Sequence, residues 1–309
     1  MLRPYAIALR SRMSVVGAGV HWAGMARQRL GQHFLADPDW REQIARAIRV
    51  SAHSSEFSVS PAHDRAAEKP YCWIEIGAGH GEMTEHLAET GAPVTAIEID
   101  APLVRRLKHL TQQYPNLQVV SNDVLKVDIA EIAAGRRARI YGNLPYYITS
   151  PILHHLFEFA PIIDEIHIVI QLEVAERLAA RPGGRDYGYL SVATQMYSRP
   201  EIVLKIPREA FDPPPEVASA LVSLKLPGLG TKIGDADKEQ VLDFVKLCFA
   251  QKRKTLVNNL KALGKADRVR AAMEGVGLRA DARAEQLKME EFVELWRELK
   301  VEKSEIASE

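Results

Sequence analysis

The chain has 309 residues, of which 47% are hydrophobic and 26% are charged. This length suits one large or two ordinary domains, and the composition is that of a globular protein rather than a disordered or fibrous one. The formal net charge is zero and no apolar run approaches the length of a membrane span, so any nucleic-acid binding must come from local basic patches, and we expect no membrane segment.

The N-terminal stretch is basic. Residues 1–36 contain no Asp or Glu and carry five arginines. This composition fits an organelle transit peptide or a basic arm that contacts RNA. It also fits a wrongly assigned start, for which Met13 and Met25 are the alternative initiator residues. We expect a disordered basic tail over residues 1–26 and a cytoplasmic protein. The segment 27–35 mixes cations, an imidazole and an aromatic ring before a predicted helix over 38–50, so it could close over a ligand as a lid.

A glycine-rich turn follows the first predicted strand of a sheet. The strand covers residues 73–76, the turn reads GAGHG over 77–81, and a helix is predicted from Glu82 to Glu89. Strand, glycine-rich turn and helix begin a doubly wound nucleotide-binding sheet. A dinucleotide fingerprint would need a third glycine where Glu82 stands, and this acid would repel a pyrophosphate at the helix N-terminus. The sequence therefore favours a cofactor without phosphate groups.

Polar residues end the next predicted strands. Glu98 follows the strand 94–97, Asp123 follows the strand 118–121, and Asn143 follows the strand 138–141. An acid in the place of Glu98 can accept hydrogen bonds from ribose hydroxyls, and Asp123 can accept from an adenine amine. Either acid alone could equally be a helix cap or a solvated charge. Together they predict an adenosine ligand along the strand ends, and without phosphate that ligand is S-adenosyl-L-methionine.

The cluster of Asn143, Leu144, Pro145 and Tyr146 can hold a planar amine. The Asn143 side chain offers a carbonyl oxygen. Pro145 restricts Leu144 to an extended conformation, which can turn a backbone carbonyl toward the same point. Tyr146 offers a flat face on which a base can stack. The alternative is an ordinary turn, because Asn and Pro are common turn residues. Next to a methyl donor, the cluster predicts methyl transfer to an exocyclic nitrogen.

Three further strands are predicted, over 165–171, 201–206 and 219–226, which makes seven. His167 alternates with apolar neighbours and is interpreted as a hydrogen-bonded core histidine. Between the last two strands, three prolines stiffen the segment 207–215 and hold Phe211 in place, and ordinary core is one interpretation of this ring. The loop 181–189 is basic and aromatic and is interpreted as either an RNA contact or a solvated loop.

The C-terminal part follows a linker-like stretch, LPGLG over 226–230. Apolar spacing predicts helices over 238–250, 253–263, 266–275 and 288–300. Lys252, Arg253 and Lys254 form a cation cluster that can contact RNA phosphates, although such clusters are often only solvated. Cys72 and Cys248 each lie in an apolar run, which indicates two buried thiols rather than a disulfide framework or a zinc site.

Several of these motifs resemble one known family, the adenine dimethyltransferases of small-subunit ribosomal RNA. The resemblance covers about residues 27–300. Its motifs are GQHFL over 31–35, EIGAG over 75–79, IEID over 97–100, NLPY over 143–146, FDPPP over 211–215 and QKRKT over 251–255. The longer loop at 51–70 and the first two dozen residues have no counterpart in the family.

After the tail over residues 1–26, the resemblance implies a Rossmann-like α/β methyltransferase domain of seven strands over 27–227 and a helical RNA-binding domain over 233–303. It also implies that Phe211 stacks on the target base, opposite the face formed by residues 143–146. It implies dimethylation of two adjacent adenosines, each at the exocyclic N6 amine, in the 3′-terminal hairpin loop of the small-subunit RNA of the pre-30S particle. We expect a monomer. The residues implied at the donor site are His33, Leu35, Glu75, Gly77, Gly79, Glu98, Asp123 and Asn143. His33 lies where relatives often have Asn, so a contact through its backbone is expected.

Other functions remain open at this point. The nearest is the related large-subunit rRNA methyltransferase of the macrolide-resistance type. Leu144, the FDPPP run and the QKRK run favour the small-subunit enzyme. A ribosome-assembly or transcription factor on the same fold is a non-enzymatic alternative. The intact polar site argues against an inactive protein but not against an added role in ribosome small-subunit biogenesis; its residues are Glu98, Asp123, Asn143 and Tyr146. A small-molecule methyltransferase is disfavoured by the basic helical region.

Overall fold

The structure, a computed structural model, describes residues 33–53, 70–233 and 235–299. The predicted tail over 1–26, the start of the lid segment and most of the loop 51–70 lie outside these residues. The described residues belong to one compact unit. No helix among them is apolar enough, over a sufficient length, to cross a membrane.

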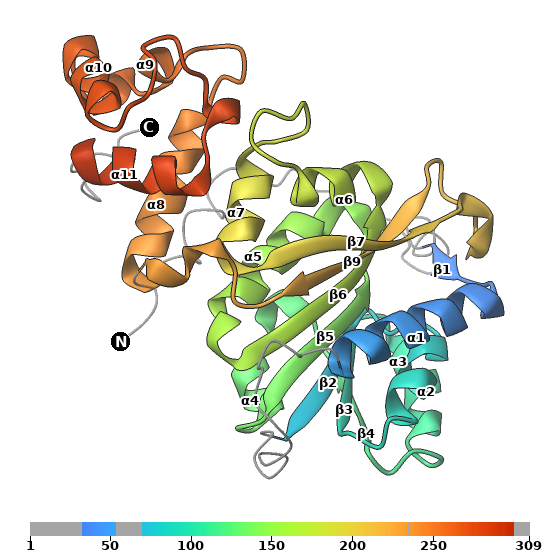
Figure 1. The fold of residues 1–309 in the computed structure, drawn as a ribbon. Coiled ribbons are helices and arrows are strands. Elements are labelled where there is room, and N and C mark those ends of the chain that lie inside the picture. Colours follow the sequence, from blue (N-terminus) through green and yellow to red (C-terminus); the bar gives the residue numbers. More distant parts are fainter. Residues whose placement is uncertain (1–32, 54–69, 234, 300–309) are drawn as a thin grey trace, which may run out of the picture. The chain divides into compact units, whose positions relative to one another are not determined.

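A seven-stranded sheet forms the centre of the fold (Figure 1). Its strand order is β4-β3-β2-β5-β6-β9-β7, in which β9 runs antiparallel to both its neighbours and the first five strands are parallel. The strands are β2 (Tyr71–Ile76), β3 (Val94–Glu98), β4 (Leu117–Ser121), β5 (Arg137–Asn143), β6 (Ile163–Gln171), β7 (Arg199–Ile206) and β9 (Ser219–Lys225). The predicted seven strands and the α/β class are confirmed.

Alternating side chains build a hydrophobic core on each face of the sheet. Ile74 and Ile140 point to one face, where α4 (Ile129–Ala133), α5 (Thr149–Glu158) and α6 (Leu172–Ala179) pack. Trp73 and Tyr141 point to the opposite face, where α1 (Pro38–His53), α2 (Glu82–Ala88) and α3 (Ala101–Leu110) pack. This alternation is the period of two expected of a strand covered on both sides.

The order of the strands places a crevice between β2 and β5. From β2 the chain continues outward through β3 and β4 on one side, and it returns to build β5 and β6 on the other. In an open α/β sheet, ligands bind at the carboxyl ends of the strands where this reversal occurs. Those ends are Ile76, next to the glycine-rich turn, and Asn143.

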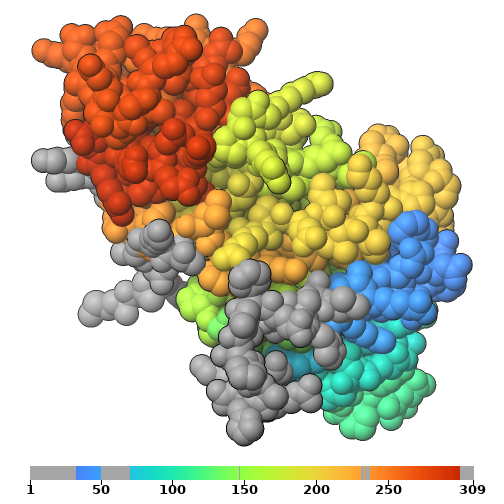
Figure 2. All heavy atoms as spheres, in the orientation of Figure 1, coloured from blue at the N-terminus to red at the C-terminus, as the bar shows by residue number. Residues whose placement is uncertain are grey.

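A short two-stranded sheet joins distant segments of the sequence. β1 (Phe34–Leu35) pairs antiparallel with β8 (Phe211–Asp212), so that Leu35 lies opposite Phe211. Figure 2 shows the blue surface of the N-terminal described residues beside the yellow surface that follows β7. The predicted lid segment is therefore attached to the proline-rich segment.

The C-terminal region is helical. It contains α8 (Asp235–Cys248), α9 (Leu256–Asn259), α10 (Ala266–Gly275) and α11 (Met289–Leu299), and these helices share one hydrophobic cluster with α7 (Tyr189–Tyr197). Short 3-10 helices cover Val124–Lys126, Tyr146–Ile148, Ala160–Ile162, Arg208–Ala210, Leu229–Lys232, Lys261–Leu263 and Ala284–Gln286. The division of the chain at residues 227–233 stays a prediction.

The predicted helix over 253–263 is wrong. Residues 251–254 form a turn, and α9 begins only at Leu256 and is four residues long. Tertiary hydrogen bonds explain the difference, because the Leu256 amide donates to the Ala282 carbonyl and the Asn259 side chain donates to the Cys248 carbonyl at the end of α8. These contacts with other segments replace the hydrogen bonds of a longer helix.

Two predictions about buried side chains are confirmed. His167 is fully buried, and its ring nitrogens contact the Ser223 hydroxyl at 2.8 Å and the Glu165 carboxylate at 3.1 Å. Cys72 and Cys248 are both buried free thiols, and burial raises the pKa of each.

Candidate functional site

The glycine-rich turn at the end of β2 depends on left-handed backbone conformations. Gly77 has φ 67° and Gly79 has φ 59°, values that favour glycine. A Cβ on Gly79 would lie 3.1 Å from the Phe34 ring, whereas one on Gly77 would meet no atom within 4 Å. The turn therefore packs against the Phe34 ring at Gly79, whereas at Gly77 it is open and a ligand can approach the backbone.

Glu98 anchors this turn to the end of β3. Its carboxylate is 2% exposed and accepts hydrogen bonds from the backbone amides of Gly79, at 2.9 Å, and of Ile99 and Asp100, at 2.8 and 2.9 Å. A carboxylate has about four lone-pair positions, so one remains for a hydroxyl. The contact of Glu98 with a ribose stays a prediction, and the structure adds a positioning role.

Asp123 lies at the end of β4 and caps a 3-10 helix. Its side chain accepts a hydrogen bond from the Leu125 amide at 3.1 Å and lies 3.9 Å from the Lys126 ammonium. The cap that the sequence left open is thus present. The cap uses one carboxylate oxygen of Asp123, and the other oxygen takes part only in the weak, exposed ion pair with Lys126. This second oxygen can still accept a hydrogen bond, and the contact with an adenine amine stays a prediction.

Asn143 is oriented by the lid segment. Its Nδ2 donates to the His33 carbonyl at 2.9 Å, across 110 positions of sequence. The side-chain oxygen of Asn143 is then the group that can accept from an amine. The His33 ring is directed elsewhere: its Nδ1 lies 2.7 Å from the Pro213 carbonyl and must donate, since a carbonyl only accepts. The backbone of His33 therefore contacts the site residue, and its ring fixes the lid.

The backbone after Asn143 distinguishes two carbonyl groups. The Pro145 carbonyl accepts from the Ile148 amide at 3.2 Å and from the Thr149 hydroxyl at 3.3 Å. Leu144 is buried, and its amide donates to the Val169 carbonyl at 3.1 Å. Its own carbonyl accepts no hydrogen bond from the residues described, so it is the better candidate for a second acceptor. The side chain of Tyr146 lies outside what the structure describes.

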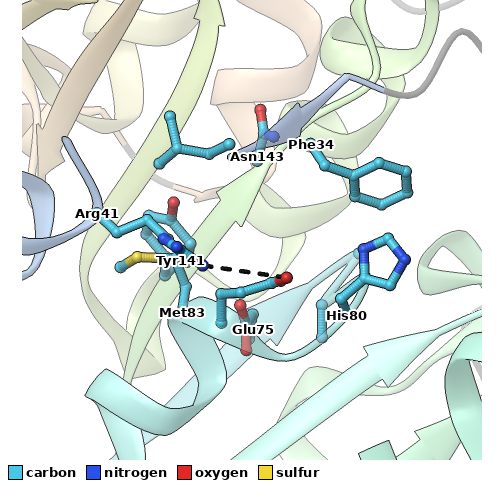
Figure 3. Close-up of a pocket in the computed structure, with 12 residues that line it drawn as sticks. Phe34, Arg41, Glu75, His80, Met83, Tyr141 and Asn143 are labelled. Carbon is cyan, nitrogen blue, oxygen red and sulfur yellow. Dashed lines mark ion pairs between the residues drawn. The ribbon is translucent and has the colours of Figure 1, made fainter. Parts of the chain in front are cut away.

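A pocket lies between the lid, the glycine-rich turn and the ends of β2 and β5 (Figure 3). It is lined by Phe34, Leu35, Arg41, Glu75, Gly77, Ala78, Gly79, His80, Glu82, Met83, Tyr141 and Asn143. The structure therefore brings together five of the predicted donor-site residues in this one cavity. Glu98 and Asp123 lie outside its lining, at the neighbouring strand ends.

The pocket includes functional groups that the sequence analysis did not identify, notably Arg41 and Tyr141. Tyr141 is the strand partner of Glu75, so both side chains point to the same face of the sheet. Arg41 reaches the pocket from the first turn of α1. The alternation along β5 could have revealed Tyr141, whereas nothing in the local sequence marks Arg41.

Glu75 and Tyr141 form the floor of the pocket. Glu75 is 2% exposed and accepts a hydrogen bond from the Thr84 hydroxyl. Burial raises the pKa of Glu75 to about 8; the Thr84 hydrogen bond opposes this shift, and the nearby charges of Glu82 and Glu98 add to it. Burial, and then the charge of Glu75, raises the pKa of the Tyr141 hydroxyl. Both groups are therefore largely protonated at neutral pH in the free protein.

The donor set fits S-adenosyl-L-methionine better than a phosphate-bearing cofactor. Glu82 and Glu85 lie in the first turn of α2, where a phosphate would otherwise bind. These acids would repel a phosphate and attract the positive charges of a methionine end. The open backbone at Gly77 leaves room for close approach.

Phe211 does not line the pocket. It is 3% exposed and belongs to the core cluster on the α1 side of the sheet. In this arrangement the ring has no open face for a base, which agrees with the alternative of ordinary core. Stacking on a target adenine stays a prediction and would require the β1–β8 pair to move.

The cations proposed for RNA lie on the turn before α9. Lys252, Arg253 and Lys254 are exposed, and the Lys252 ammonium donates to the Arg185 carbonyl at 2.8 Å. This bond places the turn beside the loop 181–189, for which the sequence analysis also considered RNA contact. Of its two tyrosines, Tyr187 is 1% exposed and packs in the helical core, so it is not available for stacking. Tyr189 is partly buried against the same core and begins α7.

Residues 24–300 match the family described as ribosomal RNA adenine dimethylase. A relative from Koribacter versatilis, a ribosomal RNA small subunit methyltransferase A, is 37% identical over 287 residues, which cover 89% of this chain and 94% of the relative. The protein of the same name from Acidobacterium capsulatum is 42% identical over 228 residues, covering 73% of this chain and 80% of the relative.

Solved structures agree with the fold. A dimethyladenosine transferase from Plasmodium falciparum has a TM-score of 0.68 and 21% identity, covering 87% of this chain and 99% of its own. The 23S rRNA methyltransferase ErmE has a TM-score of 0.61 and 29% identity, covering 87% and 100%. The higher identity to the small-subunit enzymes means that the large-subunit alternative is not favoured. The chain is an S-adenosyl-L-methionine-dependent enzyme, an rRNA adenine dimethyltransferase that belongs to the ribosomal RNA adenine dimethylase family.

Proposed function

We propose that this enzyme methylates the exocyclic N6 amines of two adjacent adenosines in the 3′-terminal hairpin loop of small-subunit rRNA, each of them twice. The names of the relatives support the small-subunit substrate. The position within the RNA is what the resemblance of the sequence motifs implies. The substrate form is the pre-30S particle, and the enzyme acts as a monomer in the cytoplasm.

The observation that most directly supports this function is the orientation of Asn143. Because its Nδ2 donates to the His33 carbonyl, its side-chain oxygen is left to accept a hydrogen bond from an amine. The oxygen of Asn143 and the carbonyl of Leu144 each accept one N6 hydrogen of adenine. Holding both hydrogens draws the nitrogen lone pair out of conjugation with the ring and makes it nucleophilic.

The protein needs little acid–base chemistry for this reaction. When bound, S-adenosyl-L-methionine supplies a methyl group on a sulfonium, which is already a good leaving group. The residues of the chain supply alignment of the amine and a protected site, which are large contributions in a transfer between two bound groups. Glu98 binds the ribose and Asp123 the adenine of the donor, while Gly77 and Gly79 allow its close approach. Leu35 and Glu75 complete the wall and floor of the donor pocket.

Mass analysis of digested rRNA from cells that lack the protein tests the proposal. Dimethyladenosine should be absent from the small-subunit RNA and return on expression of the wild-type chain. Small-subunit RNA that remains normally dimethylated would refute the assignment, and loss of methylation from large-subunit RNA would favour the alternative. Assays of the purified enzyme on naked RNA and on pre-30S particles would identify the substrate form.

A further inference from the structure

The donor pocket contains a cation that is not neutralised by close contact. Arg41 is partly buried, with 19% of its side chain exposed, and its Nη1 lies 4.0 Å from the Glu82 carboxylate, the ion pair drawn in Figure 3. This distance is too long for a hydrogen bond. Its Nη2 donates to the Ala36 carbonyl at 3.2 Å. A guanidinium has five N–H donors, so Arg41 retains donors for an acceptor within the pocket.

A second group in the same pocket lacks a partner. Tyr141 is only 1% exposed, and its hydroxyl makes no hydrogen bond with any residue that the structure describes. Buried polar groups are nearly always paired, so an unpaired hydroxyl beside a cavity indicates a ligand group. Glu75, its partner in strand register, lies next to it on the pocket floor.

We infer that Arg41 binds the α-carboxylate of the methionine end of the methyl donor and that the Tyr141 hydroxyl accepts a hydrogen bond from its α-ammonium. The inference rests on the donor assigned in the proposed function. A guanidinium matches a carboxylate through two parallel hydrogen bonds, which no other cation in this pocket can provide as well. Glu75 and Glu82 also line the pocket, and a carboxyl oxygen of either can accept a hydrogen bond from the ammonium.

The raised pKa of Glu75 removes an objection to this arrangement. With a pKa of about 8, Glu75 is mostly neutral at pH 7 in the free protein and does not repel the incoming carboxylate. Glu82 lies at the edge of the pocket, where its side chain is 35% exposed and solvent screens its charge. Arg41 is then the dominant charge that a carboxylate meets.

Binding measurements without RNA separate this contact from catalysis. Affinities for S-adenosyl-L-methionine, its decarboxylated analogue and 5′-methylthioadenosine would be measured by calorimetry for the wild-type protein, Arg41→Ala, Arg41→Gln and Arg41→Lys. We expect Arg41→Ala to lower the affinity for S-adenosyl-L-methionine by about 10- to 100-fold, since a charge-assisted contact is lost. Affinities for the analogues that lack the carboxylate should stay within twofold. Arg41→Lys should give an intermediate loss.

Controls make each outcome decisive. Arg46→Ala changes an exposed arginine of the same helix that pairs with Glu42 outside the pocket, and it should leave all three affinities unchanged. Arg41→Gln keeps a donor for the Ala36 carbonyl, so it removes the charge if the alanine variant does not fold. An equal loss for all three ligands, or no loss for any, would overturn the inference. A wild-type protein that binds none of them would instead contradict the donor assignment itself.

Tyr141→Phe tests the second half of the inference. It should weaken binding of S-adenosyl-L-methionine and of the decarboxylated analogue, which both keep the amine, and leave 5′-methylthioadenosine unaffected. Unchanged binding of the two amines would remove the hydroxyl from the site.

Discussion

The pocket edge at β2 and β5 and the cation turn before α9 differ in how their residues are held. Around the pocket, Asn143 and Glu98 are each fixed by hydrogen bonds to backbone atoms of other segments. On the turn, Arg253 and Lys254 are exposed, and Lys252 is attached by a single bond to a loop carbonyl. Pre-positioned groups suit chemistry that needs accurate alignment, whereas exposed cations suit a backbone-following, salt-dependent contact. Single substitutions should therefore be severe at the pocket and graded at the turn.

The strongest test of this contrast is Asn143→Ala. It removes the acceptor for the target amine, and we expect the rate of methylation to fall by at least about 100-fold because the amine is no longer aligned. Donor affinity should change little. Mass spectrometry of the RNA product, with calorimetry on the donor, measures both quantities. The matched control is Asn258→Ala, which changes an exposed asparagine on α9. Full dimethylation by Asn143→Ala would contradict the proposed role of Asn143 in holding the amine.

Glu98→Ala should mainly affect donor binding. The variant loses the proposed ribose acceptor and also leaves the buried amide of Gly79 without its partner. We expect the dissociation constant for S-adenosyl-L-homocysteine to rise by about 10- to 100-fold, the range for hydrogen bonds to a charged group. Calorimetry checks the value, and an unchanged constant would contradict the ribose assignment.

The cation turn should respond in a different way. Changing Lys252, Arg253 and Lys254 together to Ala should weaken RNA binding and reduce the slope of log affinity against log salt by about 2 to 3, since each lost phosphate contact contributes about 0.7 to 0.9. Donor affinity should not change. RNA binding would be titrated at several salt concentrations, with Arg270→Ala on α10 as a control. An unaltered slope would place the turn outside the RNA interface.

The last test concerns the stability of the pocket and not RNA or donor binding: a pH dependence of stability caused by Glu75. Its folded pKa of about 8 lies above its ordinary value of 4.5, because burial disfavours the charged form. Protonated Glu75 therefore contributes to the free energy of unfolding, and this contribution is complete below pH 4.5 and is lost as the pH rises through 8. Glu75→Gln stays neutral, so its melting temperature relative to wild type should increase between pH 5 and pH 9. Melting curves of the free protein across that range test this, and a constant difference would show that Glu75 ionises without cost.

Local patterns in the sequence were sufficient for the sheet and for part of the site. Apolar runs of four to eight residues predicted the strands, and polar residues after these runs predicted which side chains would meet at the strand ends, because parallel strands end at the same edge. Gly77, Gly79, Glu98 and Asn143 were found in this way. Their roles depend on short segments whose conformation the neighbouring residues largely set.

Contacts between distant segments could not be predicted in this way. The bond from Asn143 to His33, the pairing of Leu35 with Phe211 that buries this ring, and the approach of Arg41 to the pocket all join residues far apart in the chain. The short α9 has the same origin, since a bond to the Ala282 carbonyl replaces helical bonds that local spacing favoured. The amino-acid sequence by itself determined the strands and the polar groups at their ends. Only the tertiary structure decided which lone pairs and charges remain free for a ligand, because that depends on which distant groups have already paired with them.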